Sequence, residues 1–460
     1  MEQFLRQLQT IPEAAELIRR VEEGGCPAAV SGLQPVQRAC VGAAVAAACG
    51  RPAVFLCGDE REVQVLSADL ETLTGRRPVT LLGREWQFRP GAVGSRDWER
   101  SRLAALYALA QGDAPVVVAT ADGLMARTLP PETLRSLAIT LEVGGQAELG
   151  ALAEQLLSAG YTRCEQVEGV GQFALRGGIL DVFSPLMDQP VRCEFFDDEI
   201  DSMGAFDPGT QRRTRNVSSA RILPAAEVLP HCAPGGLPGL ADQLIALAEK
   251  LAKKQKTEAI VQTLREDAER LRSGAAPGAA DRYLAAIYPT VTAGVHYLPP
   301  DAVVFLSESG RVDERVKNTV LQQKQDVEAL LSAGVLAGEY AHLTLTAEEL
   351  YAALEDFPVI LEDSLPTSRH PLRPRGLLTM NAKQLSSYGG SLETAVTDLE
   401  HYRSSGSAVL VLCGGETRAK NLHRLLEEKG IPATLDLSGA AMPAAGEVRL
   451  SLGALSAGSE

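Results

Sequence analysis

Several features that mark whole classes of protein are missing from this sequence. No Gly-Lys dipeptide occurs in its 460 residues. The phosphate-binding loop GxxxxGK[ST], whose lysine meets the β- and γ-phosphates of a nucleotide, is therefore absent. The eight cysteines form no CxxC pair, and the six histidines show no HxH or HExxH spacing. We therefore expect no metal site and reduced, mostly buried thiols.

Positive charge and long apolar runs are also scarce. The 44 Lys and Arg residues face 59 Asp and Glu residues, which gives a net charge of -15 and argues against a general nucleic-acid surface. Residues 1–25 carry charges throughout and hold no apolar core of signal-peptide length. The Ala-rich run at 40–50 is too short to span a bilayer. We expect a cytoplasmic protein with no membrane segment, whose partner is another protein.

The chain is too long for a single core, since a domain usually takes about 100–200 residues. A hydrophobic content of 45% and a charged content of 22% are ordinary for a soluble globular protein. The pattern predicts a multidomain α/β fold: a degenerate helicase-like module with a parallel sheet, a small antiparallel β-rich insert and a further α/β domain. The predicted boundaries are a helical segment at 1–30, a helicase-like α/β domain at 31–135, the β-rich insert at 136–224, the second part of the module at 225–345, and a third α/β domain at 346–460.

Buried strands and helices alternate in the first part of the chain. AVFLC at 53–57 and VVVA at 116–119 are continuous apolar runs, and a helix with an apolar stripe starts at Asp59. Strands separated by helices imply a parallel sheet covered on both faces. The next segments predict a helix that stops at Gly160 and short alternating strands at 164–176, 179–183, 190–196 and about 200–206. Later segments predict one charged helix at about 240–272, a strand at 302–309, and a last helix that reaches Lys429 with Gly430 past its end.

The nucleotide-site positions of this module carry the wrong residues. VSGLQPVQRACVG at 30–42 occupies the place of the phosphate loop, with proline and glutamine instead of glycines. In the strand AVVFLSES, Ser307 stands where an aspartate would hold Mg²⁺. We predict that this span does not hydrolyse ATP. No constellation suited to a small-molecule enzyme is visible either.

The β-rich insert alternates with a period of two. VRCEFF at 191–196 puts Val191, Cys193 and Phe195 on one face, and Arg192, Glu194 and Phe196 on the other. An arginine beside an aromatic residue is typical of protein-interface hot spots. The alternative is that Phe196 is an ordinary exposed aromatic or a core residue.

Two long runs in the insert resemble the transcription-repair coupling factor family (Mfd). GYTRCEQVEGVGQFALRGGILDVFSP at 160–185 fits the family pattern QV-E-x-x-G-x-(F/Y)-A-x-RG-x-(I/L)-LD-x-F. PVRCEFFDDEIDSMGAFDPGTQRRTRNV at 190–217 fits R-x-(E/D)-FF-(G/D)-DE-(I/V)-DS and FD-x-x-(S/T)-QR. The excision-repair protein UvrB has the same insert, but FFDDEIDS followed by TQR favours the coupling factor. Weaker similarity covers the rest of the chain, including VSGLQPVQRA and YLPPDAVVFLSE.

The resemblance implies a UvrB-like module that has lost ATP binding and contains the domain that binds UvrA. The family's UvrA-contacting residues fall on Arg176, Arg192 and Phe196. It implies no catalytic residue, cofactor or metal in this span. In the family, the full protein is an ATP-dependent DNA translocase that displaces stalled RNA polymerase. Its ATP and Mg²⁺, and its contacts to RNA polymerase and duplex DNA, belong to parts beyond residue 460.

The end of the sequence departs from the family pattern. Ser459 stands where the family usually has Phe, and the chain stops one residue later, which suggests truncation inside a domain. Two alternatives remain at this point. One is an ATP-binding DNA helicase in its own right. The other is a UvrB-like damage-loading protein, although no Tyr-rich hairpin is visible near residues 60–110.

Overall fold

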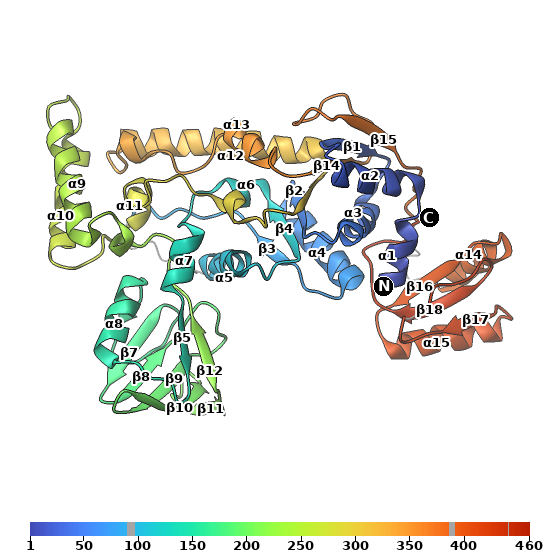
Figure 1. Ribbon diagram of the computed structural model, residues 1–460, viewed down its shortest axis with the longest axis horizontal. Coiled ribbons are helices and arrows are strands. Elements are labelled where there is room, and N and C mark those ends of the chain that lie inside the picture. The colour runs from blue at the N-terminus through green and yellow to red at the C-terminus, as the bar shows by residue number, and fades with distance from the viewer. Residues whose placement is uncertain (90–96, 386–391, 440) are drawn as a thin grey trace.

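The structure is a computed structural model that describes residues 1–89, 97–385, 392–439 and 441–460. It is a multidomain α/β fold with four sheets. A large parallel sheet lies at the centre, a β-rich insert hangs from one side of it, a helical pair projects at one end, and a small α/β unit lies beyond the other end (Figure 1).

The central sheet has seven parallel strands, and each pairs with its neighbours through parallel registers. Both faces are covered, which explains the continuous apolar runs of its inner strands. The strands predicted at 53–57 and 116–119 are confirmed. The order across the sheet is β15 (Gly376–Thr379), β1 (Ala28–Ser31), β14 (Val359–Asp363), β13 (Val303–Ser307), β2 (Ala53–Cys57), β4 (Val116–Thr120) and β3 (Val79–Leu81).

Helices cover the two faces of this sheet with separate apolar clusters. We call the sheet together with these helices the central module. One face packs against α1 (Glu2–Leu8), α2 (Pro12–Glu22), α3 (Pro35–Cys49) and α4 (Glu60–Thr74). The other packs against α5 (Asp97–Gln111), α6 (Ala121–Met125), α7 (Pro131–Leu137), α12 (Ser309–Ser332) and α13 (Ala347–Leu354).

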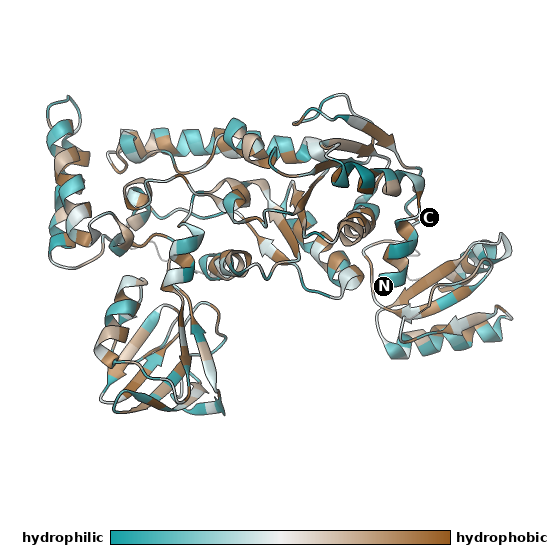
Figure 2. Cartoon of the chain, in the orientation of Figure 1, coloured by the Kyte–Doolittle hydropathy of each residue, from teal (hydrophilic) through white to brown (hydrophobic). Residues whose placement is uncertain are grey.

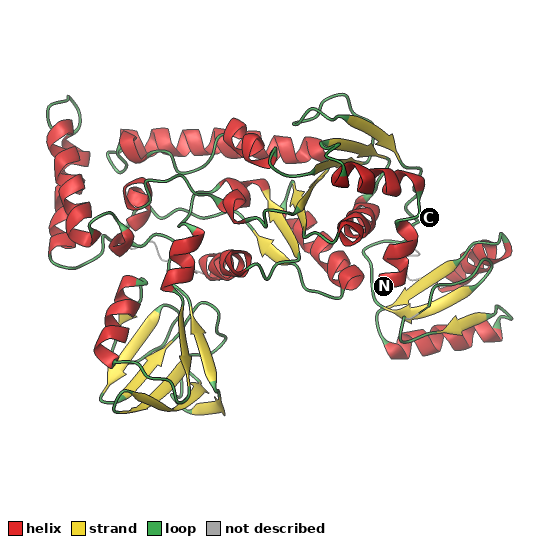
Figure 3. Ribbon diagram, viewed as in Figure 1, coloured by secondary structure: helices red, strands yellow, loops and turns green. Residues whose placement is uncertain are grey.

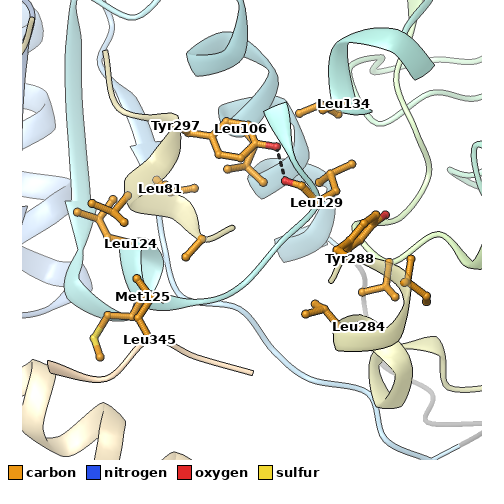
Figure 4. Packing of buried hydrophobic residues seen from close by; sticks show 14 of the residues in the cluster. Leu81, Leu106, Leu124, Met125, Leu129, Leu134, Leu284, Tyr288, Tyr297 and Leu345 are labelled. Carbon is orange, nitrogen blue, oxygen red and sulfur yellow. Dashed lines mark hydrogen bonds between the residues drawn. The ribbon is translucent and has the colours of Figure 1, made fainter. Parts of the chain in front are cut away.

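The second of these clusters is dense and includes polar anchors. Figure 4 shows part of it, where the Tyr297 hydroxyl donates a hydrogen bond to the Leu129 carbonyl at 2.8 Å. Short elements on this side complete the layer: η1 (Pro230–Cys232), η2 (Ala280–Tyr283), α11 (Leu284–Ile287), η3 (Gly294–Tyr297) and η4 (Gly338–Tyr340).

The sheet crosses the domain boundary predicted between residues 345 and 346. Strands β14 and β15 follow that boundary, yet they pair with β13 and β1. The boundary is therefore wrong as a division of the fold. The prediction failed because neighbouring strands of a parallel sheet can lie hundreds of residues apart in the sequence. The apolar pattern of a strand does not indicate which strand it pairs with.

The single charged helix predicted at 240–272 is two helices. These are α9 (Gly236–Leu251) and α10 (Glu258–Arg272), which pack side by side as the projecting helical pair (Figure 1). The break falls at the lysine-rich loop, where Lys256 has a φ of 61°. A left-handed residue of this kind cannot continue a helix.

The β-rich insert is a six-stranded sheet with one helix, as Figure 3 shows in yellow and red. The helix ending before Gly160 and the strands predicted near 179–206 are confirmed, whereas the strand predicted at 164–176 forms only over Gln172–Arg176. The strands at Ile139–Glu142, Arg213–Asn216 and Ser219–Ile222 were not predicted. The insert consists of α8 (Leu149–Ser158), the sheet β11 (Arg213–Asn216), β10 (Glu199–Phe206), β9 (Val191–Phe196), β8 (Ile179–Val182), β7 (Gln172–Arg176) and β6 (Thr162–Arg163), and the pair β5 (Ile139–Glu142) with β12 (Ser219–Ile222).

A buried ion network joins the insert to the central module. The Glu227 carboxylate, at the end of the insert, lies 2.9 Å from Arg102 and 3.7 Å from Arg84, and accepts a hydrogen bond from Thr128 at 2.6 Å. Arg84 also pairs with Asp281 at 2.5 Å. All of these side chains are buried. The network therefore fixes the segment through which the chain returns from the insert.

The C-terminal unit has a small parallel sheet with two helices. Gly430 follows its second helix with a φ of 72°, which confirms the predicted helix end. Strand β16 is apolar along its whole length, whereas β18 has Arg449 and Ser451 between its apolar residues (Figure 2). The elements are α14 (Leu392–Ser404), β16 (Val409–Cys413), α15 (Glu416–Glu428), β17 (Ala433–Leu435) and β18 (Val448–Leu452), with sheet order β16-β18-β17.

The eight cysteines are all free thiols, and five of them are buried, as predicted. Among the described residues, none of the helices is long and apolar enough to cross a membrane. Within the same residues, no group of three or more His, Cys, Asp or Glu side chains is placed to hold a metal ion.

Candidate protein-binding site

The insert sheet separates apolar and polar side chains as the period-two pattern predicts. Val191 and Cys193 are buried, and Phe195 packs against the same cluster under α8. Arg192, Glu194 and Phe196 lie on the opposite face of β9, which we call the outer face of the insert. Arg176 lies on the same face, because the registers of β7, β8 and β9 place it in the row of Ile179 and Glu194.

Arg176 and Arg192 are brought together by one carboxylate. Asp181 lies on β8, between the two strands that carry the arginines. Its Oδ1 accepts from Arg192 Nε at 2.7 Å, and its Oδ2 accepts from Arg192 Nη2 at 2.8 Å and from Arg176 Nη2 at 2.7 Å. The Asp181 side chain is only 1% exposed. Charge-assisted, bidentate bonds of this kind fix both the position and the direction of a guanidinium.

Further contacts hold Arg192 more firmly than Arg176. The Arg192 guanidinium stacks over the buried Phe206 ring at 4.7 Å and donates to the backbone and side-chain oxygens of Gln211 at 3.4 Å. The hydrogen bond to Asp181 raises the pKa of Arg192. The Arg192 side chain is 23% exposed and that of Arg176 is 49% exposed. Arg176 therefore offers more surface to a partner.

Phe196 ends β9 with its ring in solvent. The residue is 80% exposed, the largest value among the exposed large hydrophobic residues of the described chain. Asp197, at the following turn, adopts a left-handed φ of 57°, a conformation that aspartate tolerates in turns. The alternative that Phe196 belongs to the core is wrong. The apolar surface of this exposed ring is removed from water only when a partner binds over it.

Two residues that organise this face, Asp181 and Gln211, were not predicted from the alternation of apolar and polar residues. Asp181 and Gln211 both lie in the quoted motifs, as the Asp of ILDVF and the Gln of TQR, but no role was predicted for them. One signal was available for Asp181: it is a charged residue inside a short apolar strand, and such a residue needs a partner when buried. No comparable signal existed for Gln211, whose φ of 60° appears only in the structure.

The residues predicted to stand at a degenerate nucleotide site contact one another. Arg38 of α3 pairs with Glu308, after β13, and with Glu62 of α4 at 3.3 Å. Ser307 donates to Glu62 at 2.7 Å. Burial raises the pKa of the nearby Glu362 carboxyl well above its ordinary value, despite the charge of Arg38. Ser307, at the position where an aspartate was expected to hold Mg²⁺, is thus engaged in an internal hydrogen bond.

The loop before α3 is also packed against other parts of the chain. A Cβ atom on Gly32 would lie 2.0 Å from the carbonyl oxygen of Met380, the residue that follows β15, so this segment leaves no space above the glycine. The side-chain oxygen of Gln37 accepts a hydrogen bond from the backbone N–H of Gln34 at 2.8 Å. The side-chain nitrogen of Gln37 donates to the Ser459 hydroxyl at 2.9 Å. A phosphate-binding loop instead directs free backbone N–H groups at its ligand.

Comparison with known proteins agrees with the resemblance seen in the motifs. Residues 139–227 match the family model of the UvrB interaction domain. The chain is 26% identical over 448 residues to the transcription-repair-coupling factor of Bacillus subtilis (96% of this chain, 38% of the relative). It is 29% identical over 423 residues to that of Myxococcus xanthus (87% and 34%), and 26% identical over 346 residues to that of Staphylococcus aureus strain USA300 (73% and 28%). The chain therefore spans about a third of the length of these curated relatives.

Proposed function

We propose that this chain is the UvrA-recruiting part of a transcription-repair-coupling factor, and that the outer face of its β-rich insert is the docking surface. The observation that carries the proposal is the placement of Phe196, 80% exposed, on the same strand face as an ordered arginine pair. Arginine and aromatic residues dominate the binding energy of protein interfaces. This face also lies inside the segment that matches the UvrB interaction domain.

The rest of the function follows from the family resemblance. We propose that the whole protein is an ATP-dependent DNA translocase that displaces stalled RNA polymerase in transcription-coupled repair. Its contacts to RNA polymerase and duplex DNA, and its ATP and Mg²⁺, would lie outside this span. Within this span we propose a non-catalytic role, supported by the closed loop at Gly32 and the Arg38 pairs.

Removing side chains from the outer face should weaken UvrA binding. Phe196→Ala and Arg176→Ala should each cost about 2–4 kcal/mol of binding free energy, or roughly 30-fold to 1,000-fold in Kd. Arg176→Lys should also weaken binding, because lysine lacks the planar fork of donors. The melting temperature should change little, since both residues are exposed. Surface plasmon resonance with immobilised UvrA and thermal melts on the same samples measure the two effects.

A matched control is Leu377→Ala on the edge strand β15. Leu377 is also a large, exposed apolar residue, at 73%, but it lies on the central module. This variant should bind UvrA like the unmodified chain. Unchanged UvrA affinity in both Phe196→Ala and Arg176→Ala would contradict the proposed function.

ATP binding separates this proposal from a helicase in its own right. We expect no saturable heat in calorimetric titration with Mg²⁺-ATP and no release of phosphate. The physical reason is that Arg38, Gln37 and Met380 occupy the positions from which a phosphate loop would act. Saturable ATP binding that persists in a preparation freed of contaminating ATPases would overturn the non-catalytic role.

A further inference from the structure

Asp181 occupies a special position on the outer face of the insert. It lies on the central strand of the three that carry the site, and its backbone register places it opposite Arg192 on one side and Ala174 on the other. Both carboxylate oxygens are used by guanidinium groups, at 2.7–2.8 Å. With the side chain 1% exposed, Asp181 cannot itself offer much surface to a partner.

Arg176 has N–H donors that remain available to a partner. Among the described residues, the contacts of its guanidinium group comprise one hydrogen bond, from Nη2 to Asp181. A guanidinium carries five N–H donors, so the half-exposed Arg176 keeps several for a ligand. Two guanidinium groups and the carboxylates of Asp181 and Glu194 share this face, so their formal charges balance. An acidic group of a partner fits the free donors of Arg176.

We infer that Asp181 is a positioning residue, which holds Arg176 and Arg192 in one fixed arrangement before the partner arrives. This inference rests on the proposed function. Ordering long side chains upon binding reduces affinity, and an arrangement that is already fixed avoids that loss. Gln211 extends the same support, because it accepts from Arg192 and donates to the Val167 and Pro208 carbonyls at 3.1 and 2.7 Å.

The charge of Asp181 makes the sign of its effect informative. If Asp181 only neutralised the arginines, its loss would raise the positive charge of the face and strengthen binding to an acidic partner. If it positions them, its loss should weaken binding although the face becomes more positive. The two roles therefore predict opposite changes in affinity.

The test is the near-isosteric variant Asp181→Asn in the 460-residue chain, with UvrA binding measured by surface plasmon resonance. We expect binding about 10-fold to 100-fold weaker. Asp188→Asn is the matched control, because it removes the same charge from a side chain of the insert that is 98% exposed and lies beside Arg100. It should bind UvrA normally.

A double-mutant cycle distinguishes positioning from a general loss of structure. In a background of Arg176→Ala with Arg192→Ala, Asp181→Asn should have no further effect on UvrA affinity, whereas unfolding of the insert would weaken binding in any background. Arg192→Lys tests the same inference with Asp181 intact, because lysine keeps the charge but cannot bridge both oxygens. It should weaken binding to a similar degree.

The outcomes are separable. If Phe196→Ala and Arg176→Ala lose UvrA while Asp181→Asn binds normally or more tightly, the positioning role is wrong and the proposed function stands. An undiminished effect of Asp181→Asn in the arginine-free background would also overturn the positioning role. If none of the variants affects UvrA binding, the proposed function itself fails.

Discussion

Replacing Glu227 by alanine is expected to lower the free energy of unfolding of the central module by about 3–5 kcal/mol. Glu227 is fully buried and faces Arg102 and Arg84, which are themselves buried. Removal of the carboxylate leaves two guanidinium groups in a dry environment, although Asp281 still pairs with Arg84 and Glu99 also lies near it. Breaking a buried ion network from one side costs far more than losing an exposed pair, because the remaining charge cannot return to water.

Tryptophan fluorescence reports on this region directly. The two tryptophans of the chain are Trp86 and Trp98, and the Arg84 guanidinium lies 4.3 Å from the Trp86 ring. Urea denaturation followed by this signal should show the loss in Glu227→Ala. The control is Glu132→Ala, which removes a glutamate that pairs with Arg135 at 3.3 Å but is 77% exposed. Its effect should stay within about 0.5 kcal/mol, and equal effects of the two variants would contradict the role of burial.

The same network predicts a pH dependence. Burial would raise the pKa of the Glu227 carboxyl, but the charges of Arg102 and Arg84 and the hydrogen bond from Thr128 bring it below its ordinary value of 4.5. The stability that this carboxylate supplies is therefore complete above about pH 4.5 and is lost as the pH falls through the lower pKa of the folded state. In Glu227→Gln, the acid-induced decrease in unfolding free energy that comes from this carboxyl should be absent when urea denaturation is repeated at falling pH.

The sequence predicted well where one element determines its own pattern. Strand β9 alternates strictly, so the sides of Arg192 and Phe196 could be predicted without knowing any neighbouring strand. Likewise, the apolar stripe of α4 and the glycine after α15 follow from local geometry. In each of these cases, the repeat of apolar residues or the capping residue lies within the element itself, so no distant part of the chain is needed to predict it.

The sequence predicted poorly where two distant elements meet. Ser31 pairs with Thr379 in the central sheet, and nothing in the apolar run of β1 indicates a partner almost 350 residues away. The link from Arg176 and Arg192 to Asp181 depends on the registers of β7, β8 and β9, and a shift of one residue would place Asp181 on the opposite face. The motif identified the residues of the site, but only the registers explain how they act together.

Arg38→Ala is the second substitution with a large expected effect, a loss of about 3 kcal/mol in the free energy of unfolding of the central module. The Arg38 side chain is 3% exposed, and it is the cation that faces Glu308 and Glu62. The two glutamates are 24% and 13% exposed, so water can partly solvate them once the arginine is gone. We therefore expect the lower end of the range for broken buried pairs.

The expected loss tests whether the ion pairs of Arg38 are structural. If they are, removal of Arg38 should destabilise the module and should not create ATP binding. Arg61→Ala is the matched control, because Arg61 is an exposed arginine on α4 beside Glu62 and should change stability by less than about 0.5 kcal/mol. Adding Glu308→Gln to Arg38→Ala should recover part of the loss, since one of the unpaired carboxylates is then neutral. Urea denaturation of the three variants, followed by tryptophan fluorescence, measures these differences. An Arg38→Ala variant that is as stable as the control would mean that the internal ion pairs do not hold this edge of the central sheet together.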